Sequence, residues 1–68
     1  MKISARNQIG GTITDVVKGA TTAHVKIDIG GGNLLTASIT NEAAEELGLK
    51  KGMKATAIIK SSDVIVGV

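Results

Sequence analysis

The chain has 68 residues, a formal net charge of +2, and no Cys, Phe, Tyr or Trp. One domain, residues 1–68, is the most that this length allows, and a domain this small buries only about 60% of the surface that its unfolded chain exposes, so we expect association between copies. The dispersed Lys and Arg residues and the missing aromatic rings argue against a nucleic-acid partner, because single strands are usually held by stacking on such rings.

Apolar and polar side chains alternate with a period of two along residues 3–17. The apolar residues occupy odd positions: Ile3, Ala5, Ile9, Ile13 and Val17. This alternation predicts a strand with one core face and one polar face. Turn residues at 18–19 follow, and the same alternation over residues 21–29 predicts a second strand that pairs back on the first.

Further strands are predicted on both sides of a helical segment. The Gly-Gly-Gly-Asn run at residues 30–33 can adopt the positive φ angles of a tight reversal, so residues 34–39 are predicted as a third strand. Residues 53–60 are predicted as a fourth strand, and residues 63–68 as a fifth after Ser61-Ser62. The fold class is therefore all-β: a five-stranded OB-type barrel of order β-β-β-α-β-β, with one short helix.

One short helix is predicted over residues 43–47. Thr40 or Asn41 is a suitable N-cap, Glu42 lies in the first turn where the helix dipole favours a carboxylate, and Gly48 ends the helix. Because so short a helix is unstable alone in water, its apolar side chains are expected to plug one end of the barrel. These side chains are Ala44, Leu47 and Leu49.

The residues favour a binding protein over an enzyme. No nucleophile with a base, no carboxylate pair and no metal cluster is recognisable, and Glu42, Glu45 and Glu46 lie on a helix that must present one face to water. His24 stands alone on a polar strand face without a second ligand at metal spacing. We expect neither catalysis nor a metal centre.

Anion binding needs only a few donors and an unneutralised cation, and two segments offer both. Ser4 and Arg6 lie on the polar face of the first strand, about 7 Å apart along it. Lys60 ends an apolar strand and is followed by the hydroxyls of Ser61 and Ser62. A third candidate segment is the helix start at Thr40 and Asn41, where unsatisfied N–H groups attract negative charge, although Glu42 competes for the same position. These segments predict a small-anion site.

Other interpretations of the same residues remain open. Lys60 could extend from a strand end into water, and Arg6 could pair with Asp63 on a neighbouring strand. Charged strand faces are commonly just solvated, so the residue types alone do not decide between a site and a solvated surface.

Two distant motifs resemble the signature ends of the molybdenum-pterin-binding, or Mop, domain family, whose single-domain members are the molbindins. The first is Ile-Ser-Ala-Arg-Asn-Gln at residues 3–8, followed by Gly11, and the second is Ile-Ile-Lys-Ser-Ser-Asp-Val at residues 58–64. The resemblance extends over essentially the whole chain, including the turns at residues 18–19 and 30–33. The length of the chain and both motifs agree with that family.

The resemblance implies an OB-type barrel that exchanges its N-terminal strand with a partner and assembles as a homo-hexamer, a trimer of dimers. Molybdate or tungstate would bind between subunits, with no catalytic cofactor and no metal other than the molybdenum of the oxyanion. Carried over by position, the main site comprises Ser4, Arg6, Lys60 and Ser61, with Thr40 and Ala43 from a neighbouring subunit. A second class of site near the threefold axis would use backbone N–H groups of Gly19, Ala20 and Thr21.

Three functions follow from these observations. The first is cytoplasmic storage or buffering of molybdate for cofactor biosynthesis, and the second is a molybdate-sensing module acting through a partner transporter or regulator. The third is an OB-fold nucleic-acid binder, which the composition disfavours. A cytoplasmic location is expected, with no membrane partner, because neither a signal peptide nor an apolar run of membrane-spanning length is present.

Overall fold

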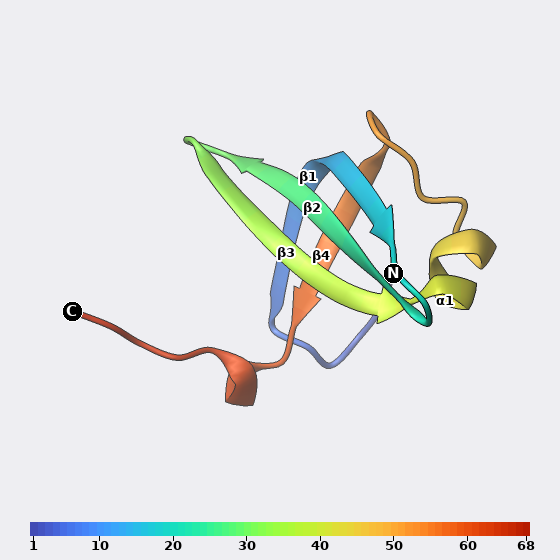
Figure 1. Cartoon of the computed structure of the whole chain (residues 1–68). Helices are drawn as coiled ribbons and strands as arrows, with labels where there is room; N and C mark the ends of the chain where they lie inside the picture. Colours follow the sequence, from blue (N-terminus) through green and yellow to red (C-terminus); the bar gives the residue numbers. More distant parts are fainter.

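The computed structural model describes all 68 residues and contains one curled antiparallel sheet with a short helix at its end (Figure 1). Its elements are β1 (Asn7–Lys18), β2 (Thr22–Gly30), β3 (Asn33–Thr40), α1 (Asn41–Glu46), β4 (Lys54–Ile59) and the 3-10 helix η1 (Ser61–Asp63). The strand order in the sheet is β3-β2-β1-β4. The predicted all-β class, with one short helix between the third and fourth strands, is confirmed.

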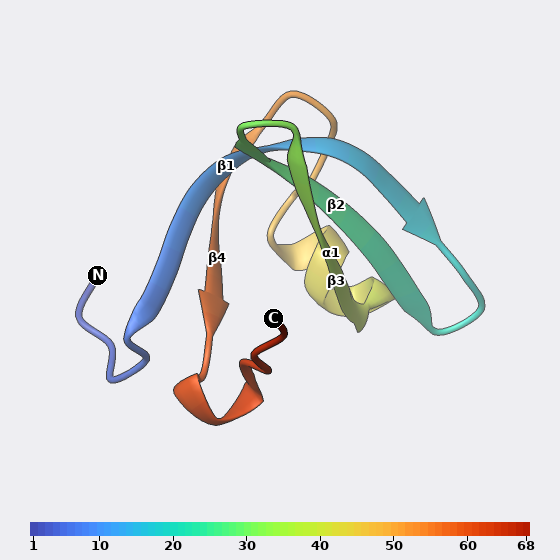
Figure 2. The ribbon, with the colours of Figure 1, turned by 90° about the vertical axis from the view of Figure 1, so that its left-hand side faces the viewer.

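The long strand β1 gives the sheet its curl, because it changes partner along its length. Its first half pairs with β4, from Asn7 opposite Ile59 to Thr12 opposite Lys54, and its second half pairs with β2. Figure 2 shows β1 arching over the molecule between these two partners. The result is a half-closed barrel whose concave side carries the core.

The core is small and lies under β2. Ile13, Val25 and Ile27 form its buried cluster, and Ala23 and Ala44 are the other buried residues. On β2 the predicted alternation is confirmed: the odd positions turn inward, while the side chains between them are exposed. With five buried residues in the whole chain, little apolar surface is removed from water within one copy.

A β-bulge in β1 overturns part of the predicted alternation. Ile13 pairs with Ile27, but the next pair along is Asp15 with Lys26, so Thr14 is an extra residue. The extra residue reverses the faces that follow, and Val16 packs on the core while Val17 is 56% exposed. The prediction that Val17 faces the core is wrong for this reason. The strand also begins at Asn7 rather than Ile3.

The helix has one of the two predicted N-caps, but it begins at Asn41, two residues before the predicted start, and it contributes fewer core residues than expected. Thr40 is the N-cap, and its hydroxyl oxygen accepts a hydrogen bond of 3.1 Å from the Ala43 N–H. Ala44 is buried and Leu49 packs against the core, as predicted. Leu47, expected to plug the barrel end, is 63% exposed, so this part of the prediction is wrong; α1 ends at Glu46, one residue earlier than predicted. No helix is both long and apolar enough to cross a bilayer.

The predicted fifth strand does not form within the chain. Residues 61–63 form η1, and residues 64–68 continue without strand pairing. As a consequence β3 and β4 each keep one unpaired edge, and the barrel stays open between them. The five-stranded barrel is therefore corrected to a four-stranded half-barrel in a single copy, because no local contact holds the last segment on the sheet.

Candidate anion-binding site

A surface depression of about 460 Å³ lies where the N-terminal residues meet the connection after β4. Its lining residues are Ile3, Ser4, Ala5, Arg6, Ile58, Lys60, Ser61 and Ser62. Five of the residues singled out in the sequence, from two segments at opposite ends of the chain, thus share one concavity. They are Ser4, Arg6, Lys60, Ser61 and Ser62.

Strand pairing brings the two segments together. Asn7 pairs with Ile59 at the end of the β1–β4 ladder. Arg6 directly precedes Asn7 and Lys60 directly follows Ile59, so both cations leave the sheet at the same end. The side chain of Asn7 reinforces this junction, because its Nδ2 donates a hydrogen bond of 3.1 Å to the main-chain oxygen of Ile59. The site residues are positioned by the last rung of the β1–β4 ladder.

The two cations of the depression have no counter-charge within the chain. The single ion pair of the structure joins Lys18 to Glu45, at the other end of β1, so neither Arg6 nor Lys60 is neutralised. The alternative pairing of Arg6 with Asp63 is not formed. Positive charge in a concavity of this size attracts small anions.

Hydrogen-bond donors accompany this charge. The hydroxyls of Ser4 and Ser61 make no hydrogen bond in the structure, and the main-chain N–H groups of Ser61 and Ser62 have no acceptor. Together with the guanidinium and the ammonium group, they form the set of directed donors that an oxyanion requires. The arrangement can bind a small oxyanion.

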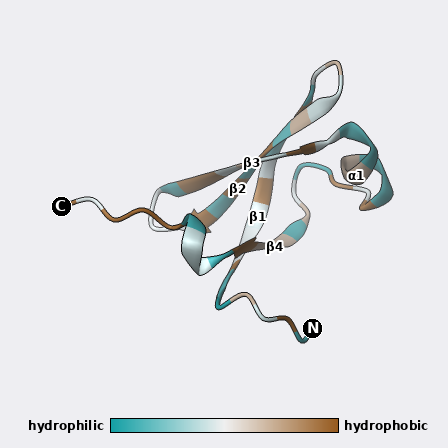
Figure 3. Ribbon diagram, turned by 90° about the horizontal axis from the view of Figure 1, so that it is seen from below, coloured by the Kyte–Doolittle hydropathy of each residue, from teal (hydrophilic) through white to brown (hydrophobic).

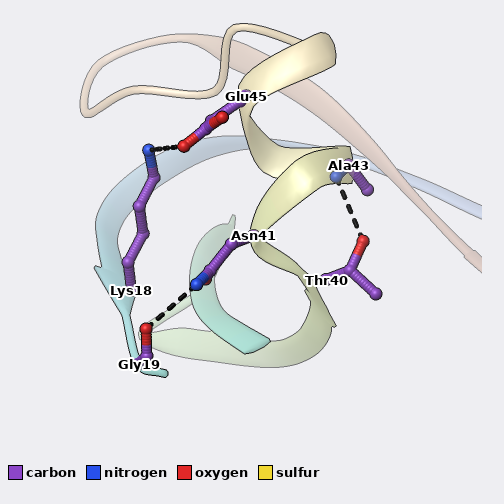
Figure 4. A network of polar contacts seen from close by, with 6 residues as sticks. All are labelled: Lys18, Gly19, Thr40, Asn41, Ala43 and Glu45. Atoms are coloured by element: carbon purple, nitrogen blue, oxygen red, sulfur yellow. Dashed lines mark hydrogen bonds and ion pairs between the residues drawn. The ribbon is translucent and has the colours of Figure 1, made fainter. Parts of the chain in front are cut away.

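Thr40 and Ala43 lie elsewhere, at the start of α1. Their positions are drawn in Figure 4, where the Ala43 N–H donates to the Thr40 hydroxyl oxygen. That N–H is therefore occupied, whereas the hydroxyl proton of Thr40 remains available to a ligand. Within one copy, these two residues contribute to a different surface from the depression.

The turn at Gly19, Ala20 and Thr21 lies next to the helix start. Asn41 joins the two. Its Nδ2 donates to the Gly19 oxygen at 2.9 Å (Figure 4). Its backbone N–H donates to the Thr21 oxygen, also at 2.9 Å. The N–H groups of Ala20 and Thr21 make no hydrogen bond. This turn therefore presents main-chain donors, with its carbonyl groups turned toward Asn41.

The candidate residues thus form two groups at opposite ends of β1. Figure 2 shows the N-terminal residues and η1 on one side of the molecule and the β1–β2 turn on the other. One copy brings Ser4, Arg6, Lys60 and Ser61 together but does not bring Thr40 or the turn to them. Any site that uses both groups requires more than one copy.

Sequence reasoning left some lining residues out of the candidate set. The apolar residues Ile3, Ala5 and Ile58 also line the depression. Their position in the sequence could have identified them, since each lies within one of the two motifs. His24 lies on the exposed face of β2, and no group of three His, Cys, Asp or Glu residues gathers anywhere in the structure.

Comparison with known proteins adds to this geometry. Residues 3–66 match the TOBE domain family. The chain is 48% identical over 66 residues to molybdenum-pterin-binding protein 1 of Clostridium pasteurianum, an alignment that covers 97% of each chain. The similarity is therefore not confined to the two motifs.

Two solved structures share the fold. A molybdate binding protein from Sporomusa ovata superposes with a TM-score of 0.93 at 37% identity, covering 100% of both chains. The cytoplasmic molybdate-binding protein ModG, with molybdate bound, superposes with a TM-score of 0.94 at 46% identity, covering 100% of this chain and 48% of that one. The half-barrel and its extended last segment fall within both alignments.

Proposed function

The chain belongs to the TOBE domain family, and from this membership we propose that it binds a tetrahedral oxyanion, molybdate first and tungstate second. Relatives and solved structures that align with nearly the whole chain are named for binding molybdenum or molybdate. The role is binding rather than catalysis, and the anion is the ligand, with no catalytic cofactor. The charge and the hydrogen-bond donors of the depression support a binding role.

The main site is the depression that contains Arg6 and Lys60. A dianion leaves water only when several directed, charge-assisted hydrogen bonds replace its hydration shell. Two cations without counter-charges match its two negative charges, and the hydroxyls of Ser4 and Ser61 supply neutral donors. The observation that carries the proposal is that Arg6 and Lys60 line one concavity and neither is neutralised.

The remaining candidate residues complete sites from neighbouring copies of a hexamer, a trimer of dimers. Thr40 turns its hydroxyl proton toward the anion of an adjacent copy, and Ala43 joins it if its N–H is released from the cap. A second class of site, around the threefold axis, uses the turn at Gly19, Ala20 and Thr21, where the N–H groups of Ala20 and Thr21 are free and that of Gly19 donates to the Thr22 oxygen at 2.7 Å. The separation of the two groups within one copy supports sites at interfaces.

The biological role that we propose is storage or buffering of molybdate in the cytoplasm, supplying cofactor biosynthesis. Sulfate has the same charge and shape as molybdate but is smaller, so the cage must discriminate chiefly by size. Retention of molybdate in the presence of excess sulfate is therefore a property that such a protein needs.

The test is elemental analysis of the protein purified from cells grown with added molybdate, followed by light scattering of the same sample. We expect bound molybdenum that survives dialysis against excess sulfate, in a particle of six chains. Absence of molybdenum, together with no heat signal when molybdate is titrated into the protein, would refute the proposed ligand. A stable monomer at micromolar concentration would refute the proposed assembly.

A further inference from the structure

Two amide side chains of the N-terminal motif, Asn7 and Gln8, lie next to the candidate anion site but do not line it. Each donates a hydrogen bond to a main-chain oxygen. The Nδ2 atom of Asn7 donates to Ile59 at 3.1 Å, and the Nε2 atom of Gln8 donates to Ala5 at 3.3 Å. The first bond joins residues 52 positions apart, and the second closes a short loop that contains Arg6.

The Lys60 half of the site is held by its own main chain. In η1 the N–H of Asp63 donates to the Lys60 oxygen at 2.9 Å, and the N–H of Val64 donates to the Ser61 oxygen at 3.3 Å. These bonds fix the backbone from which the ammonium group and one of the hydroxyls extend. This half of the site is therefore ordered without help from side chains.

The Arg6 half has no such support. No backbone–backbone hydrogen bond involves residues 1–6. Figures 2 and 3 both show this segment outside the sheet, continuing from the start of β1. The pair that precedes it, Asn7 with Ile59, is the last of the ladder, and strand ends fray unless further contacts hold them. The side chains of Asn7 and Gln8 supply those contacts, so they do for Arg6 what the main chain of η1 does for Lys60.

A cation that is held in place before the ligand arrives binds it more tightly. A mobile segment must be immobilised during binding, which costs free energy and lowers the affinity, whereas an ordered segment avoids that cost. We propose that Asn7, assisted by Gln8, is a positioning residue of the anion site. Without touching the anion, it keeps the backbone of Arg6 at the depression. This inference rests on the proposed function, because it concerns the same site.

Double-mutant cycles, measured by titration of molybdate into the whole protein in a calorimeter, test this role. Asn7→Ala should lower the affinity about three- to tenfold, the usual effect of ordering one or two side chains during binding. Because Asn7 acts through Arg6, the same change should have much less effect when Arg6→Ala is already present. It should keep its full effect beside Lys60→Ala. A purely structural loss would weaken binding equally in both backgrounds.

Asn33→Ala is the matched control. The Nδ2 atom of Asn33 also donates to a main-chain oxygen, that of Gly30 at 3.3 Å, but in a turn that does not line the depression. This variant should bind molybdate as the parent protein does. Gln8→Ala should weaken binding in the same direction as Asn7→Ala but less, because its hydrogen bond is longer and exposed. Circular dichroism should show all these variants folded, since none removes a buried residue.

Nitrogen-15 relaxation of the anion-free protein provides a second measurement. The backbone amide of Arg6 should be ordered in the parent and more mobile in Asn7→Ala, while the amide of Lys60 stays the same in both. An Arg6 amide that is equally mobile in the two proteins overturns the proposal. So does parent-like affinity in Asn7→Ala, or equal weakening beside Arg6→Ala and Lys60→Ala. A parent protein that binds no molybdate refutes the proposed function itself, and with it the positioning role.

Discussion

Gly11 of β1 lies so close to the main chain of Asp28 that a Cβ atom at Gly11 would stand 2.5 Å from the Asp28 carbonyl oxygen. The same atom would stand 2.7 Å from Cγ2 of Ile27, a core residue. This contact lies where β1 passes from β4 to β2, with Gly11 opposite Ala55 and Thr12 opposite Asp28. The curl of the sheet therefore depends on a residue without a side chain at this point.

We expect Gly11→Ala to lower the free energy of unfolding by about 1–3 kcal/mol, the usual effect of overpacking, because the opposing atom is backbone and cannot swing away. Gly10→Ala is the matched control, since nothing lies within 4 Å of its added Cβ. It should be neutral or stabilising by about 0.4–1 kcal/mol through the unfolded state. Urea unfolding at one fixed protein concentration measures both, and equal effects at the two positions would contradict the close contact.

Arg6→Ala and Lys60→Ala should each weaken molybdate binding. Removing either cation leaves a desolvated dianion without one charged donor, which costs about 1.5–3 kcal/mol, or roughly one to two powers of ten in Kd. Lys26→Ala is the control, because Lys26 is an exposed cation on the outer face of β2 and lines no depression. Titration calorimetry measures all three, and unchanged affinity in both site variants would remove the assignment of the site.

Thr40→Ala should destabilise the protein by about 1 kcal/mol, because the first turn of α1 loses the hydroxyl oxygen that accepts the Ala43 N–H. Thr40→Ser keeps that oxygen and should stay close to the parent protein. Thermal unfolding followed by circular dichroism compares the two. If serine were as harmful as alanine, the threonine methyl group rather than the cap would be the important part of the side chain.

The Lys18–Glu45 ion pair should contribute little to the free energy of unfolding. Its charged groups are 3.1 Å apart, but the two side chains are 48% and 64% exposed, and pairs in water contribute about 0.2–1 kcal/mol. A double-mutant cycle with Lys18→Met and Glu45→Gln should give a coupling energy in that range that disappears in about 1 M salt. A coupling that persists at high salt would indicate that the pair is shielded from solvent by another copy.

The sequence alone predicted the features that depend on neighbouring residues. The alternation of β2, with Ala23, Val25 and Ile27 inward, follows from the two-residue repeat of a strand, and the structure confirms it. The cap at Thr40 follows from the chemistry of a hydroxyl placed before a helix, and it is also confirmed. The two motifs that line the depression were also recognisable, because each is a pattern of neighbouring residues.

Features that depend on strand pairing escaped prediction. The bulge at Thr14 reverses the faces of Val16 and Val17, and it exists because β1 must bend between two partners that are distant in the chain. The unpaired state of residues 64–68 also could not be predicted from the sequence. Their residue types favour a strand, but a strand forms only where a sheet edge is available to pair with it.

The sequence by itself determined which residues alternate, which cap the helix, and which carry the charge and hydroxyls of a candidate anion site. Tertiary structure alone decided that Arg6 and Lys60 line one depression, because the pairing of Asn7 with Ile59 carries both chain segments to one end of the sheet. It also decided that Thr40 and the Gly19 turn lie at the other end. The physical reason is that backbone pairing between distant segments is set by burial of the whole sheet, whereas periodicity and capping act over a few residues.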